Sequence, residues 1–168
     1  MSNLKQSIDR HNKSILRKKI MPPKTCNCRR PAECPMDGNC LKESVIYQAT
    51  VSTEDNNPPQ TYMGLTENSF KTRYSNHKMS FCNSNKRLST ELSKHIWHLR
   101  ENNTNFKVTW KILKQAALYN PASNRFNLCL WEKYFIICKP ELASLNKRNE
   151  LVTSCRNANK FLLKNAKF

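Results

Sequence analysis

The chain has 168 residues, of which 38% are hydrophobic and 9% aromatic, enough for one modest hydrophobic core. Its formal net charge is +17, and the two flanks, residues 1–43 and 147–168, together supply +11 of this excess. A charge of this size favours a polyanionic partner such as DNA, with RNA as the alternative, because each lysine or arginine that meets a phosphate releases condensed counterions. A membrane surface or plain solubility would explain the charge less specifically.

Neither a signal peptide nor a membrane span is visible in the sequence. The first twenty residues carry charges throughout, and the longest apolar run, residues 134–138, is far shorter than the roughly 20 residues that span a bilayer. We therefore expect an intracellular protein with no membrane partner. In that setting the eight cysteines are better interpreted as metal ligands or buried thiols than as disulfides.

Residues 1–25 predict a basic connector. Apolar residues at positions 4, 8, 15 and 16 could line a short helix, which would end at Pro22 and Pro23 because proline cannot continue it.

A cysteine-rich module is predicted over residues 26–43. Four cysteines fall within fifteen residues in the pattern C-x-C-x5-C-x5-C, namely Cys26, Cys28, Cys34 and Cys40. Four thiolates delivered by short loops suit the tetrahedral coordination of Zn²⁺, and Pro35 and Gly38 would shape the turns between them. Such a zinc knuckle would be structural, since four protein ligands leave no open position for water. The alternative is free thiols in a disordered linker.

Residues 44–155 predict one α+β domain. Runs rich in β-branched and aromatic residues, or alternating between apolar and polar, predict strands over 44–52, 61–65 and 106–113. Helices are predicted over 69–81, 88–102 and 123–138, and in the second of them the apolar residues fall at helical spacing.

Two of these helices carry a further expectation. The helix over 88–102 would present one apolar face made of Leu88, Leu92, Ile96 and Leu99. The helix over 123–138 is apolar nearly all round, which predicts a central position. A short helix near 148–155 and a basic tail over 156–168 would end the chain.

Motifs that follow one another in this domain resemble those of the GIY-YIG nuclease family. Val45-Ile46-Tyr47 precedes Tyr62-Met63-Gly64, after which come Arg73 and His77, a helical Glu132 and finally Asn146. Together with the cysteine pattern, residues 3–163 are similar to the endonuclease domain at the C-terminal end of Penelope-like retroelements. The resemblance implies a small three-stranded, mainly antiparallel sheet flanked by helices. In that family a reverse transcriptase precedes this domain, and no such region is present in this sequence.

The resemblance also implies a role for each residue in metal-dependent phosphodiester hydrolysis. Such a reaction needs an activated water, a stabilised phosphoryl group and a neutralised leaving group. Tyr47 would help to activate the water, Tyr62 would orient water or phosphate, and Arg73 would clamp the scissile phosphate. His77 would act as an auxiliary base or proton relay, and Glu132 would be the one protein ligand of Mg²⁺ or Mn²⁺.

Two further residues would support this site, and each assignment has a plainer alternative. Gly64 would let the backbone pass close to DNA, and Asn146 would brace the site or merely cap a turn. The tyrosines could be packing residues, and Arg73 with His77 could be a solvated basic face. Glu132 could form a salt bridge with an arginine, although its otherwise apolar helix face makes an unpaired carboxylate costly.

The chain departs from the family pattern in places that bear on function. Val45 replaces the first glycine of the GIY triplet. Where relatives often show Cys-x2-Cys and Cys-Arg-His, only Cys129 and Cys155 are present, so a second metal site is expected to be lost. The leading hypothesis is a nuclear, retroelement-derived DNA endonuclease that nicks its target. The alternatives are a catalytically inactive or domesticated DNA-binding remnant and a zinc-ribbon RNA-binding protein.

Overall fold

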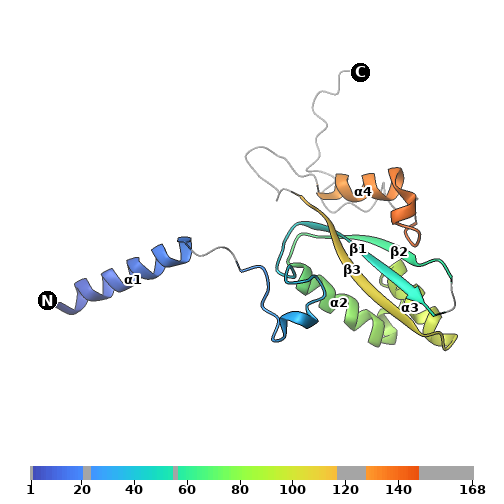
Figure 1. Cartoon of the computed structure of the whole chain (residues 1–168), viewed down its shortest axis with the longest axis horizontal. Coiled ribbons are helices and arrows are strands. Elements are labelled where there is room, and N and C mark those ends of the chain that lie inside the picture. Colours follow the sequence, from blue (N-terminus) through green and yellow to red (C-terminus); the bar gives the residue numbers. More distant parts are fainter. Residues whose placement is uncertain (1, 21–23, 55–56, 117–127, 148–168) are drawn as a thin grey trace, which may run out of the picture.

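A computed structural model describes residues 2–20, 24–54, 57–116 and 128–147 (Figure 1). Its helices and strands, in chain order, are α1 (Ser2–Ile20), β1 (Val45–Thr53), β2 (Gln60–Thr66), α2 (Phe70–Cys82), α3 (Glu91–Glu101), β3 (Phe106–Gln115) and α4 (Leu128–Cys138). The strands form one sheet in the order β2-β1-β3, and both pairs are antiparallel. The predicted α+β class, with a three-stranded antiparallel sheet flanked by helices and a cysteine cluster ahead of it, is therefore confirmed.

Helices cover both faces of the sheet, so the central strand β1 is almost entirely buried. Alternate side chains of β1, such as Val45 and Tyr47, pack toward α2 and α3, whereas Ile46 packs toward α4. Figure 1 shows α2 and α3 on one side of the sheet and α4 on the other. In this register Tyr47 lies opposite Gly64 and Ala49 lies opposite Tyr62, which places both tyrosines on the α2 face.

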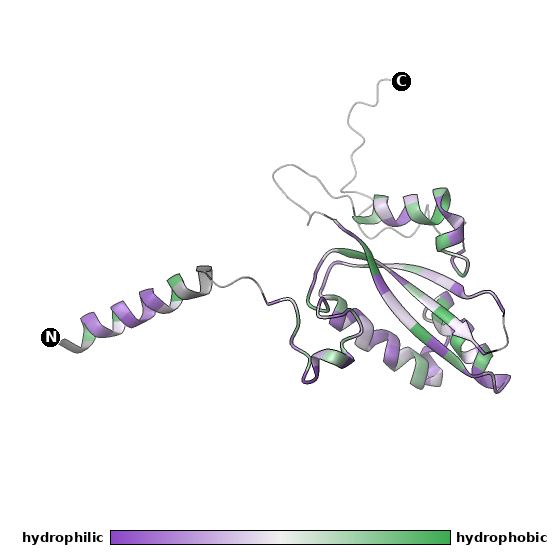
Figure 2. Ribbon diagram, in the orientation of Figure 1, coloured by the Kyte–Doolittle hydropathy of each residue, from purple (hydrophilic) through white to green (hydrophobic). Residues whose placement is uncertain are grey.

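The third strand behaves as its alternating sequence predicts. Four apolar side chains contact the α2-side core, namely Phe106, Val108, Trp110 and Ile112. The intervening residues 107, 109 and 111 are exposed. Hydrophobic and hydrophilic bands alternate along β3 in Figure 2. This strand therefore contributes one face to the core and leaves the other to solvent.

Helix α3 begins later than predicted, at Glu91 instead of residue 88. The Thr90 hydroxyl accepts a hydrogen bond from the backbone N–H of Ser93, which makes Thr90 the N-cap. Leu88 precedes this cap and is 67% exposed, while Leu92 is fully buried on the apolar face. The prediction that Leu88 belongs to the buried face is therefore wrong.

Helix α4 is not the central helix that its composition predicts. Only Leu128 and Ile136 are buried in it, and three of its apolar residues are about half exposed, namely Leu130, Tyr134 and Ile137. The helix lies as a single layer on the sheet and is not enclosed by other described elements (Figure 1). The predicted residues 123–127 of this helix lie outside the described part of the chain, as do the predicted helix near 148–155, the basic tail and Cys155.

The predicted N-terminal helix is present as α1, which extends away from the sheet (Figure 1). Its apolar residues Leu4, Ile8, Ile15 and Leu16 are all exposed, and the helix is mainly hydrophilic in Figure 2. Within the described residues, no helix is both long enough and apolar enough to cross a membrane.

Candidate metal centre and active site

The four cysteines of the module converge on one point. The sulfur atoms of Cys26, Cys28, Cys34 and Cys40 all lie within 4.8 Å of one another. Cys40 Sγ lies 3.7 Å from Cys28 Sγ and 3.6 Å from Cys26 Sγ. A tetrahedral zinc with bonds of about 2.3 Å would separate its sulfur ligands by about 3.8 Å. The cluster therefore fits one metal ion, and its all-thiolate donor set is consistent with zinc.

A tight turn after Cys34 prepares this sulfur for a metal. Asp37 and Gly38 both have a left-handed backbone, with φ of 46° and 84°, so Gly38 shapes the turn as predicted. The turn directs the N–H groups of Met36 and Gly38 at the Cys34 sulfur. Burial acts in the opposite direction, but these hydrogen bonds lower the Cys34 pKa to about 7. The thiolate is the form that binds metal, so this turn favours metal binding at Cys34, whereas burial raises the pKa of Cys28 and of Cys40.

The module is joined to the first turn of α2. The backbone N–H groups of Phe70 and Lys71 donate to the carbonyls of Lys42 and Cys40, at 3.0 and 2.7 Å. Both N–H groups belong to the first turn of the helix, where no intrahelical acceptor is available. The Lys71 ammonium also donates to Asn27 Oδ1 at 2.6 Å. The cysteine module therefore fixes where α2 begins and how it is oriented.

On the α2 face of the sheet, Tyr47, Arg73 and His77 form a buried hydrogen-bonded group. Tyr47 is fully buried, and its hydroxyl accepts a hydrogen bond from Arg73 Nε at 2.9 Å. The same oxygen lies 2.7 Å from His77 Nε2. Because the guanidinium can only donate, the Tyr47 hydroxyl keeps its own proton available, and it donates this proton to His77 Nε2 in the tautomer that carries its proton on Nδ1.

The interior location sets the charge of this group. Burial raises the pKa of Tyr47 to about 12, although the positive charge of Arg73 opposes the shift. Burial and the same arginine lower the pKa of His77 to about 3. Tyr47 is therefore protonated and His77 neutral at physiological pH. The His77 side chain is 2% exposed, so it contacts Tyr47 and has no access to bulk water.

Gly64 has a packing role that the sequence did not indicate. It is buried inside β2, directly across from Tyr47, and a Cβ atom added to it would overlap the Tyr47 hydroxyl. The residue is glycine because the tyrosine ring occupies the space of a side chain. The structure thus gives a packing reason for glycine at this position, and the expectation that Gly64 lets the backbone pass close to DNA stays a prediction.

Beside this buried group lies an open cavity of about 370 Å³. Tyr62 of β2, Arg73 of α2, Glu132 of α4 and Asn146 from the segment after α4 all line it. These four residues were each singled out in the sequence, and the fold brings them together. Tyr47 and His77 do not line the cavity; they lie behind Arg73 in the core.

Glu132 is the acidic group of this cavity. Burial raises its pKa to about 7, against the opposing charges of Arg73 and Lys133. Within the described residues no ion pair joins Glu132 to an arginine, so the salt-bridge alternative finds no support. A carboxylate placed in this way is most easily ionised by a cation that enters the cavity.

Asn146 fixes one wall of the cavity through the backbone of β2. Its Oδ1 accepts from the Met63 N–H at 2.7 Å, and its Nδ2 donates to the Met63 carbonyl at 2.9 Å. The Leu145 N–H also donates to the Thr61 carbonyl at 2.9 Å. The Asn146 carboxamide thus makes the two hydrogen bonds that a peptide group of a neighbouring strand would make. In this way Asn146 holds the segment that follows α4 against β2.

Three charged residues of the cavity wall were not singled out in the sequence. Glu91 Oε1 lies 2.6 Å from Lys94 Nζ and 3.5 Å from Lys147 Nζ, and all three line the cavity. The Glu91–Lys94 pair follows helical i,i+3 spacing and could have been found from the sequence. Lys147 could not have been found in this way, because it belongs to a segment more than fifty residues beyond Glu91 in the chain.

No protein-family model, curated protein or solved structure matches this chain. Membership of the GIY-YIG family and an origin in a Penelope-like element stay predictions from the sequence motifs.

Proposed function

We propose that this protein is a metal-dependent DNA endonuclease that nicks phosphodiester bonds. The proposal rests on one observation. One open cavity is lined by Arg73, by Tyr62 and by Glu132, whose pKa is raised, and each of these residues belongs to a different element. Two lysines on the same wall add positive charge for a polyanionic substrate. A retroelement origin and a nuclear location belong to the same proposal and come from the motif resemblance alone.

Arg73 is the residue that would hold the scissile phosphate. The Arg73 guanidinium hydrogen-bonds the Tyr47 hydroxyl through Nε and also bonds Tyr62, which leaves its remaining N–H groups for phosphate oxygens. Tyr47 and His77 would therefore act as positioning residues that set the orientation of Arg73. Tyr62, whose ring lies 6.0 Å from that of His77, is the tyrosine that would meet the substrate or the attacking water.

Glu132 would hold the divalent cation. Mg²⁺ is commonly bound by one or two carboxylates and completes its coordination with water and substrate phosphate oxygens, so a single glutamate in a polar cavity fits it. When bound, the ion would offset phosphate charge and favour ionisation of a bound water. Glu91 is held by Lys94 and Lys147, which leaves Glu132 as the carboxylate available for this purpose.

For the cysteine cluster we propose a structural zinc ion. Four thiolates complete a tetrahedron and leave no position for substrate, which separates this site from the cavity. The metal content of folded protein is the test. About one zinc per chain is expected, and less than half a zinc per chain would refute the assignment.

Conversion of supercoiled plasmid to open circle tests the proposed activity. With Mg²⁺ or Mn²⁺ the unmutated chain should nick, and Glu132→Gln and Arg73→Ala should each slow nicking by at least about 100-fold. The first change removes the ligand of the cation, and the second removes positive charge that would stabilise the transition state. Glu141→Gln and Lys111→Ala are matched controls at exposed positions outside the cavity and should nick normally.

A negative result would also be informative. If the unmutated chain leaves plasmid supercoiled across a series of salts and metals but still retards it on a gel, the protein is a DNA-binding module without nuclease activity. If it neither nicks nor retards DNA, both functions are excluded.

A further inference from the structure

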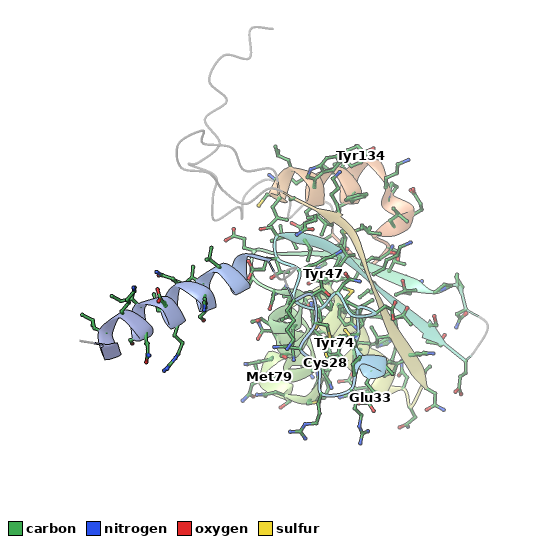
Figure 3. The ribbon with its side chains drawn as sticks, turned by 60° about the vertical axis from the view of Figure 1, so that its left-hand side comes forward. Cys28, Glu33, Tyr47, Tyr74, Met79 and Tyr134 are labelled. Carbon is green, nitrogen blue, oxygen red and sulfur yellow. The ribbon has the colours of Figure 1, made fainter. Side chains whose placement is uncertain are left out.

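A second basic groove lies between the cysteine module and α2. It encloses about 470 Å³ and is lined by Cys28, Arg29, Arg30, Glu33, Pro35, Lys71, Tyr74, Ser75 and Lys78. Figure 3 labels Cys28, Glu33 and Tyr74, which border it from the module and from the helix. Four of the lining side chains are cationic and one is acidic, so the groove carries a net positive charge.

The groove is separate from the cavity that contains Glu132. An α-helix turns by about 100° per residue, so Lys71 and Arg73 point about 160° apart around the axis of α2. Lys78 lies on the Lys71 side of the helix, and none of the groove residues lines the cavity. The helix therefore presents one cation to the cavity and two others to the groove behind it.

The walls of the groove are held in place before any ligand binds. Lys71 is anchored to the module by its hydrogen bond to Asn27 Oδ1, and its backbone N–H bonds Cys40. The Tyr74 ring forms part of the wall and packs against Phe70 and Trp110, with centroid distances of 6.1 and 5.6 Å. A site fixed in this way loses little conformational entropy on binding.

The side chains indicate a strand of linked phosphates as the ligand. Arg29 and Arg30 are exposed at one wall and Lys78 is exposed at the other, which suits an anion with several successive charges. The Lys78 ammonium lies 5.4 Å from the centre of the Tyr74 ring, so a cation that can meet a phosphate lies beside a flat apolar surface that can pack against the adjoining sugar. Glu33 is paired with Arg30 at 2.9 Å, which reduces its repulsion of an anion.

We propose that this groove binds the sugar–phosphate backbone of a nucleic acid at a site distinct from the cutting cavity. The inference shares with the proposed function the assumption that nucleic acid is the partner, but it does not depend on cutting. The cysteine module would then do more than fold: it would supply one wall of the groove through Arg29 and Arg30. Such a contact would recognise the charge and the shape of the sugar–phosphate backbone, so it would be independent of base sequence.

Binding of labelled DNA to the full chain tests this assignment. The probe is a fluorescein-labelled duplex of about 20 base pairs, and the protein carries Glu132→Gln and is free of added divalent cations, so that no cutting intervenes. The groove variant is Arg29→Gln/Arg30→Gln/Lys78→Gln. The control, Lys86→Gln/Lys107→Gln/Lys111→Gln, removes the same charge from exposed residues outside both sites.

Loss of three phosphate contacts should reduce the slope of log Kd against log salt by about 2 to 3. Affinity at physiological salt should fall at least about 10-fold in the groove variant and less than about 3-fold in the control. Equal losses in the two variants would overturn the assignment, because they would report net charge alone. A deca-glutamate peptide that binds more tightly than the duplex, with the same dependence on the groove, would also overturn it in favour of an acidic protein.

Failure of this inference can be separated from failure of the proposed function. With Glu132 restored and Mg²⁺ present, the groove variant should nick at the unmutated kcat once DNA is saturating, with a KM raised at least about 10-fold to match the weaker binding. Normal nicking with unchanged binding would exclude the groove and leave the cavity proposal intact. Lost binding in a chain that never nicks would support the groove and exclude the nuclease.

Discussion

The cysteine module and the cavity are built in opposite ways. The module collects four identical ligands from fifteen consecutive residues through local turns, and it contributes little to the sheet. The cavity collects its residues from β2, α2, α4 and the segment beyond α4, and it exists only once the sheet has formed. The geometry of the module therefore comes from local turns and that of the cavity from the tertiary fold. They meet at α2, whose first turn bonds the module and whose Arg73 reaches the cavity.

The largest effect should come from removing the metal of the module. Cys40→Ser removes a fully buried ligand, and we expect it to abolish zinc binding and to lower the free energy of unfolding by about 3–5 kcal/mol. Urea denaturation with parallel metal analysis would measure both. Cys82→Ser, at an exposed cysteine outside the cluster, is the control. An unchanged denaturation midpoint for Cys40→Ser would show that the cavity region folds without the module.

A smaller effect is expected where Gly64 meets Tyr47. Gly64→Ala forces a methyl group against the tyrosine hydroxyl and should cost about 1–3 kcal/mol of stability. Removing the hydroxyl with Tyr47→Phe should relieve part of this overlap, so the two changes should couple by about 1 kcal/mol in a double-mutant cycle. Simple additivity would mean that the backbone of β2 moves away from the ring instead.

Near neutral pH the smallest effect is a dependence of stability on pH through His77, and this effect grows as the pH falls. Its pKa is lowered in the folded protein to about 3, whereas the unfolded chain takes up the proton near pH 6.5. The stabilisation is thus complete above pH 6.5 and declines as the pH falls toward 3, by at most about 1.4 kcal/mol per pH unit. His77→Gln should flatten this slope in denaturation series at several pH values. The exposed His98→Gln should leave it unchanged.

Local features of this protein were predictable, and features set by tertiary packing were not. Cysteine spacing identified the cluster of four thiols, and the alternation of β3 identified its buried face, because both depend on neighbouring residues. The position of α4 could not be inferred, since a helix that is apolar all round does not reveal how much of it the sheet covers. The complete burial of Tyr47 could not be predicted either. A strand pattern indicates which face of the sheet a side chain lies on, but not which element packs over that face.

The cavity was predicted in part. Motif order named Tyr62, Arg73, Glu132 and Asn146, and the fold places all four on its lining. Glu91 and Lys147 were missed because their pairing spans distant segments of the chain. The packing of Gly64 against Tyr47 was missed for a related reason: its cross-strand partner follows from the register, which the sequence of the loop between β1 and β2 does not determine.

The bond between Asn146 and Met63 has a consequence for how this protein behaves at high concentration. A sheet edge with free N–H and carbonyl groups is a template on which a strand from another molecule can add. At Met63 both groups are already occupied by one side-chain amide, and the Leu145 N–H occupies the Thr61 carbonyl. The segment after α4 thus works as a built-in cap against intermolecular strand addition along β2. Cleaving the chain ahead of residue 144 would uncover that edge and favour self-association.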